Sequence, residues 1–161
     1  MLELPATHEH VSRITVNGQP VSYKIDGEAV GKPRILVEAG MAAEYDIVIR
    51  WGGFSLKYEP LSVTVPQGHR FTLNAPGVYY SWKDPQQVLT EVSTKEGQLT
   101  AIAKGVMGQR TFFVLYRQGG LHWWLPVHLN VTPLLDWQHD AEGKMLAVTV
   151  TNQGQRPLVG T

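Results

Sequence analysis

Residues 121–130 read LHWWLPVHLN, and this stretch shows most clearly the alternation that decides the fold. Successive side chains of a β-strand point to opposite faces of the sheet. One face of this segment is wholly apolar and is predicted to lie in the core; it consists of Leu121, Trp123, Leu125, Val127 and Leu129. The opposite face consists of His122, Trp124, Pro126, His128 and Asn130. Because proline has no N–H, Pro126 predicts that this strand lies at a sheet edge or carries a bulge.

The same period of two recurs along the chain. Asn17-Gly18 separates two β-prone runs, and this dipeptide is the strongest short signal of a hairpin. Strands are predicted at residues 11–16, 21–25, 34–38, 45–51, 55–59, 61–65, 70–73, 78–82, 88–92, 99–103, 110–116, 121–129 and 145–151. No window shows an apolar stripe at helical spacing, and the nearest candidate, residues 37–43, is short and contains Gly40. We therefore predict an all-β chain.

This number of short strands exceeds one compact sandwich. Two architectures fit: a single large antiparallel β-sandwich, or two small immunoglobulin-like sandwich units. The second is favoured, because residues 62–77, SVTVPQGHRFTLNAPG, resemble the opening of a new β-module. We expect units at residues 1–65 and 66–132, and a hairpin in residues 133–161. Such a short tail cannot bury a sheet alone. It either completes an earlier sheet or opens a further, truncated module, and we favour the truncated module.

The composition excludes several classes of function. Lys plus Arg and Asp plus Glu are both 14, so the net charge is zero, which argues against nucleic-acid and polybasic membrane-surface binding. There is no cysteine, which excludes disulfides, thiol catalysis and Cys-based zinc sites. No apolar run is long enough to span a membrane, and no signal peptide is visible at Met1.

Motifs for catalysis and for cofactors are also missing. His8 and His10 are the one pair with metal-ligand spacing, and a pair is too few for a zinc site. The acidic residues are scattered, and no nucleophile elbow, Walker loop or dinucleotide-binding glycine motif is present. We predict a chain that is not an enzyme and that has no metal and no cofactor.

Two stretches in residues 98–161 carry a resemblance. FFVLYRQGGLHWWLPVHLNVTP (residues 112–133) and MLAVTVTNQGQRPL (residues 145–158) are similar in style to β-sandwich modules of secreted bacterial polysaccharide-degrading enzymes. In those modules a final strand rich in Trp and Pro leads into the next β-domain. The resemblance implies an accessory or carbohydrate-binding module, secreted or periplasmic, beside a catalytic domain.

Aromatic residues supply the candidate binding site. If its face meets solvent, Trp124 is an aromatic platform for a polysaccharide or oligosaccharide, with His122 and His128 as flanking hydrogen-bond donors. Tyr79 and Trp82 form a second aromatic cluster at a loop. Each has a structural alternative: Trp124 beneath a loop or another module, and Trp82 in the core.

Two further tryptophans are given structural roles: Trp51 is predicted in the core, and Trp137 in a seam between modules. The function predicted first is non-catalytic polysaccharide binding. The alternative is a structural module that docks or spaces a catalytic domain.

Overall fold

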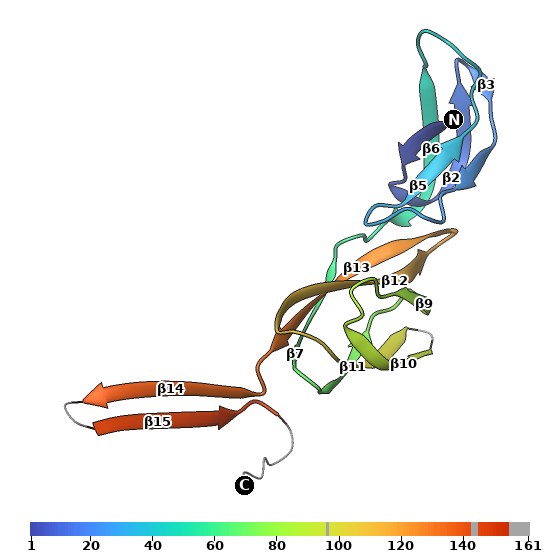
Figure 1. Ribbon diagram of the computed structural model, residues 1–161. Helices are drawn as coiled ribbons and strands as arrows, with labels where there is room; N and C mark the ends of the chain where they lie inside the picture. Colours follow the sequence, from blue (N-terminus) through green and yellow to red (C-terminus); the bar gives the residue numbers. More distant parts are fainter. Residues whose placement is uncertain (96, 143–144, 155–161) are drawn as a thin grey trace.

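The computed structural model describes residues 1–95, 97–142 and 145–154, and for residues 78–80 and 141–142 it describes the backbone alone. The described residues form strands and turns and no helix, so the predictions of an all-β chain and of antiparallel sheets are confirmed. Within this part of the chain, no helix is long and apolar enough to cross a membrane. Figure 1 shows two β-units in a row and a separate hairpin at the far end.

The first unit contains two small sheets. Its strands are β1 (Leu2–Pro5), β2 (His8–Val16), β3 (Gln19–Pro20), β4 (Tyr23–Ile25), β5 (Arg34–Val37) and β6 (Ile47–Ser55). One sheet has the order β1-β5-β4, and the other has the order β3-β2-β6. The predicted Asn17-Gly18 turn joins β2 to β3, and both residues have positive φ, 49° and 77°. Ile14, Ile35 and Val37 lie in the buried cluster of the molecule.

The second unit contains a larger sheet of order β7-β13-β12-β9 and a smaller one of order β10-β11-β8. Its strands are β7 (Leu61–Pro66), β8 (Arg70–Asn74), β9 (Val78–Lys83), β10 (Leu89–Lys95), β11 (Gln98–Ala103), β12 (Gly108–Gln118) and β13 (Leu121–Thr132). Phe71 of β8 contacts Phe112 of β12, with ring centroids 6.2 Å apart, so side chains of both sheets meet in one core.

The boundary between the units differs from the predicted one. We expected residues 61–65 in the first unit, but β7 pairs in parallel with β13, from Leu61↔Val127 to Pro66↔Thr132. The sheet pairing therefore assigns these residues to the second unit. The predicted strand at residues 55–59 is wrong, because residues 56–60 connect β6 to β7 without forming a strand.

Strand β13 lies between β7 and β12, and its register with β12 is continuous, so it carries no bulge at Pro126. Because β7 pairs with β13 only from Val127 onward, residues 121–126 form an edge of the sheet, and the predicted edge is present at Pro126 although not along the whole strand. The predicted core set is confirmed: Leu121, Trp123, Leu125, Val127 and Leu129 are all buried. Pro126 is accommodated by its position. The N–H and C=O of Trp124 point away from β12 and bond to the first unit. In a strand, the backbone N–H and C=O groups of residues two apart point to the same edge, so those of position 126 also point away from β12. Pro126 therefore costs no bond to β12, and β7 begins only opposite Val127.

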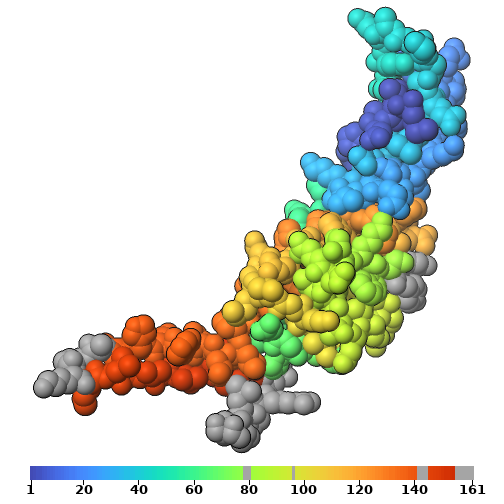
Figure 2. All heavy atoms as spheres, in the orientation of Figure 1, coloured from blue at the N-terminus to red at the C-terminus, as the bar shows by residue number. Residues whose placement is uncertain are grey.

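The hairpin of β14 (Leu135–Glu142) and β15 (Met145–Asn152) pairs only within itself among the described strands. The tail therefore forms the predicted hairpin, and it completes neither earlier sheet. Trp137 is 76% exposed, so it fills no seam among the described residues. The hairpin extends away from the second unit (Figures 1 and 2).

The predicted core position of Trp51 is only partly met, because Trp51 is half-buried and packs against the core from its periphery.

Candidate functional site at the seam between the units

The two β-units meet through a backbone bridge at Trp124. The N–H of Trp124 donates to the carbonyl of Ala29 at 2.8 Å, and the N–H of Gly31 donates to the carbonyl of Trp124 at 2.8 Å. Val30 and Trp124 thus form a parallel β-bridge between the first unit and β13. Gly31 has a φ of +75°, which L side chains rarely adopt, so glycine suits this crossing. The edge of β13 that β7 does not cover is paired here by the first unit.

A second group of bonds surrounds the turn between β12 and β13. The side-chain amide of Gln118 donates to the carbonyl of Ser55 at 3.0 Å, and its oxygen accepts from the N–H of Lys57 at 2.9 Å. Gln118 also donates to Glu9 at 3.3 Å, and the N–H of Gly120 donates to the carbonyl of Glu9 at 3.1 Å. These contacts, the Trp124 bridge and the contacts of Lys83 described next are together called the seam below. The bonds around this turn join Ser55 and Lys57, at the end of β6 and just after it, and Glu9 of β2 to one end of the second unit.

Lys83 adds a third contact. Its ammonium lies 4.0 Å from the centroid of the Trp124 ring and 2.7 Å from Glu28 Oε2 of the first unit. A cation over an indole face is attracted by the electron density of the ring. The Lys83 and Glu28 side chains are 47% and 78% exposed, so solvent screens their ion pair, and such pairs contribute at most about 1 kcal/mol. Lys83 thus links the Trp124 ring to the first unit.

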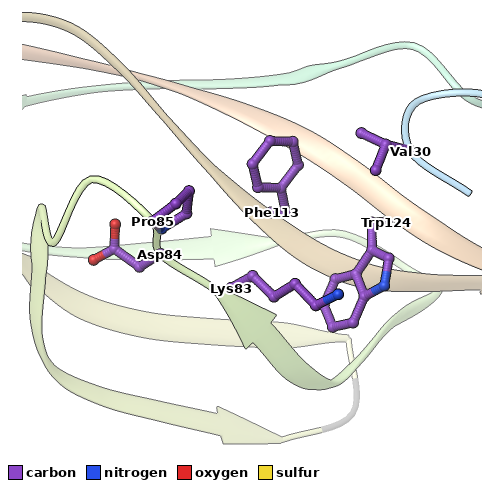
Figure 3. Close-up of a pocket in the computed structure, with 6 residues that line it drawn as sticks. All are labelled: Val30, Lys83, Asp84, Pro85, Phe113 and Trp124. Carbon is purple, nitrogen blue, oxygen red and sulfur yellow. The ribbon is translucent and has the colours of Figure 1, made fainter. Parts of the chain in front are cut away.

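A pocket of about 420 Å³ lies beside this contact. It is lined by Val30 of the first unit and by Lys83, Asp84, Pro85, Phe113 and Trp124 of the second. Figure 3 shows Phe113 and Trp124 on one side, with Lys83 reaching along the indole. The carboxylate of Asp84 points away from these two rings (Figure 3), and its Oδ2 accepts from the N–H of Leu89 at 2.8 Å. The pocket is therefore mostly apolar, with the Lys83 ammonium as its closest charge to the rings.

Three buried polar atoms in the second unit have no hydrogen-bond partner among the described residues: Asp84 Oδ1, Trp123 Nε1 and Trp124 Nε1. Two of them belong to residues that line the pocket. Leaving such an atom unpaired costs about 1–3 kcal/mol.

One titratable group in the second unit is shifted by burial. Tyr116 of β12 packs on Trp123, with ring centroids 5.2 Å apart, and desolvation raises the pKa of its phenol above the usual value. It lies on the core side of the sheet, away from the pocket.

The exposed platform predicted at Trp124 is wrong, since Trp124 is only 8% exposed. The alternation correctly placed its side chain opposite the core, but the first unit covers that end of the sheet. His122 is half-buried beneath the same unit: a Cβ at Gly27 would lie 3.2 Å from His122 Nε2. His128 is exposed, and its Nδ1 lies 3.3 Å from Thr111 Oγ1.

The five predicted site residues do not form one site. Trp82 is 39% exposed and pairs with Val114, which is buried, so Trp82 lies on the opposite face of the sheet from Lys83 and Trp124. His128 is six residues beyond His122, outside the seam. The side chain of Tyr79 lies outside the described residues. Of the four predicted residues whose side chains are described, only Trp124 and His122 lie together, and both are covered by the first unit.

Sequence reasoning missed the residues that make the seam: residues 29–31, Gln118 and Lys83. The one available signal was the unpaired N–H and C=O that an edge segment of β13 must satisfy. Nothing in the local pattern of residues 28–31 marks them as the partner.

Neither a protein-family model nor a curated protein sequence matches the chain. The described residues contain no group of three His, Asp or Glu side chains placed to hold a metal ion.

Proposed function

We propose that this chain is a non-catalytic structural module that holds two β-units in a fixed relative orientation. The observation that carries the proposal is the burial of Trp124, with its backbone bonded to residues 29 and 31. A flexible linker would leave the units without directional contacts, whereas the seam joins three separate segments of the first unit to the second. On the basis of the resemblance described above, we propose further that the module belongs to a larger secreted protein, as a spacer beside a catalytic domain.

The strand order supports an immunoglobulin-like sandwich for the second unit. In that fold one sheet contains strands B, E and D, and the other contains strands C, F and G. The sheets β8-β11-β10 and β9-β12-β13 follow these two orders, and β7 adds in parallel beside β13. Such sandwiches serve as repeated extracellular building blocks, in keeping with a spacer.

The spacer proposal is tested by the distance between spin labels on the two units. The chain has no cysteine, so Gln19→Cys in β3 and Ser93→Cys in β10 give two unique sites, both exposed. We expect a narrow distance distribution by pulsed electron paramagnetic resonance. Gln118→Ala removes three side-chain bonds of the seam and should broaden it, whereas Gln109→Ala, at an exposed position of the same strand, should not. A broad distribution in the otherwise unaltered chain would refute the proposal.

Polysaccharide binding is a second candidate function, and the pocket is the observation that favours it. Phe113, Pro85 and Trp124 give an apolar lining, and the Lys83 ammonium offers a donor to hydroxyl oxygens. Sugars are held by this combination of apolar face and polar rim.

A pull-down against soluble and insoluble polysaccharides tests this candidate. Retention lost in Phe113→Ala would locate a glycan at the pocket, and retention lost in Trp82→Ala would locate it on the opposite sheet face. Trp137→Ala, on the separate hairpin, is the control. Absence of retention by every glycan leaves the spacer as the sole proposal.

A further inference from the structure

The outward face of β2 and β6 carries two arginines side by side. Arg13 and Arg50 are directly opposite in the antiparallel register, and both are exposed. A bulge between Val11 and Arg13 shifts the register and brings the two into this pairing. Like charges directly opposite one another destabilise a sheet. This pair is therefore unfavourable for the unit by itself. It lies in the first unit, away from the hairpin β14–β15 (Figure 1).

Neither guanidinium has a hydrogen-bond or ion-pair partner within the described ranges of the chain. The contrast with Arg34 of the same unit is clear, since Arg34 pairs with Glu3 at 3.2 Å and with Asp26 at 2.6 Å. The first unit therefore neutralises one of its arginines internally and leaves two adjacent arginines free to bind an external anion.

A hollow of about 210 Å³ lies between these arginines and the turn after β2. It is lined by Arg13, Thr15, Gly18, Val48 and Arg50. A hollow of this size has room for a small oxyanion. A Cβ at Gly18 would meet nothing within 4 Å, so access over the turn is open.

Further donors continue along the same face. A Cβ at Gly52 would lie 2.8 Å from Ser12 Oγ and 2.9 Å from His10 Cε1, so these two side chains lie over Gly52, beside Arg50. Thr15, which lines the hollow, adds a hydroxyl group to the same face. No described acidic side chain lines the hollow.

We propose that Arg13 and Arg50 form a binding site for an oxyanion, either a planar carboxylate or a tetrahedral sulfate or phosphate group of a ligand. The planar fork of each guanidinium matches two oxygens of such a group, and a bound anion replaces repulsion between the arginines by attraction to both. Thr15 supplies a hydroxyl donor at the side of the hollow. This site lies outside the seam and is independent of the spacer function.

The test is a titration of the ¹⁵N-labelled chain with sodium acetate, sulfate and phosphate, each at ionic strength held constant with sodium chloride. We expect saturable shifts of the amides of Thr15, Gly18 and Arg50 with at least one anion. Arg13→Gln and Arg50→Gln should each weaken that binding at least tenfold. Arg117→Gln, which alters an exposed arginine of the second unit, should leave it unchanged.

The anion that binds identifies the chemical group of the ligand. Binding of acetate would indicate a carboxylate, and binding of sulfate or phosphate would indicate a sulfate or phosphate ester. Arg13→Lys is a second variant, which retains the charge but loses the planar fork, and it should bind more weakly than the parent. Linear shifts that do not saturate with any anion would overturn the proposal. Equal weakening by Arg117→Gln would overturn it too, because it would show a general charge effect.

Discussion

The hairpins β12–β13 and β14–β15 have the same alternating pattern and opposite environments. In β13 the apolar face is buried in the core, and part of the other face is covered by the first unit. In the second hairpin the apolar face is exposed throughout its described residues, which are Leu135, Trp137, Leu146, Val148 and Val150. Alternation therefore predicts a strand and its two faces, and the rest of the fold decides whether either face is buried.

The largest expected difference between the hairpins is in hydrogen exchange. Core strands exchange only when the whole unit unfolds, at a cost of about 5 kcal/mol or more, whereas isolated two-stranded hairpins open readily. We expect amides of β12 and β13 to exchange at least ~10³-fold more slowly than those of β14 and β15. Mass spectrometry of exchanged peptides measures this. Similar protection in the two hairpins would mean that another surface covers the second one in solution.

A matched pair of tryptophan substitutions sharpens the comparison. Trp123 is fully buried and Trp137 is 76% exposed. Trp123→Ala should lower the free energy of unfolding by about 3–5 kcal/mol, because it leaves a large cavity. Trp137→Ala should change it by no more than about 0.5 kcal/mol, as expected for exposed positions. Urea denaturation followed by circular dichroism gives both values. Equal losses would contradict the assigned burial.

The sequence analysis was correct for features that depend on neighbouring residues and wrong for features that depend on contacts between the two units. The core face of β13 and the Asn17-Gly18 turn follow from local rules, because alternation and positive φ are properties of neighbouring residues. The cover over Trp124 comes from residues 29–31, far away in the sequence, and depends on how two units meet. Pro126 correctly indicated a local edge, because it lies between the Trp124 bridge and the start of β7, but it could not show that β7 pairs with the rest of the strand.

A smaller effect is expected at Lys83, where the outward face of the first hairpin contacts the first unit. Lys83→Met should lower the free energy of unfolding by about 0.5–1 kcal/mol, through loss of the contacts with the Trp124 ring and Glu28. High salt should reduce the difference, because it screens the ion pair. Lys95→Met, on an exposed position of β10, serves as the control. Because methionine keeps an unbranched apolar chain, a loss that does not depend on salt would assign the effect to the contact with the Trp124 ring and not to the Glu28 ion pair.

The smallest effect concerns Tyr116, which packs against the buried Trp123. Burial raises the pKa of its phenol, so the unfolded chain releases this proton at lower pH than the folded chain does. Its contribution to stability is therefore complete below the unfolded pKa, and it is lost as the pH rises through the folded pKa. Absorbance titration of the chain and of Tyr116→Phe should show that the missing phenol is one that ionises late. Loss of an early-ionising phenol would contradict this.

The central claim is that the seam at Trp124 fixes the first unit on the second, and residual dipolar couplings test it most directly. Couplings from backbone amides of β1–β6 and of β7–β13 each define an alignment tensor. A fixed seam predicts that the two tensors coincide in orientation and magnitude when referred to the structure described here. Two tensors of different magnitude would show that the units reorient independently, and would contradict the spacer function.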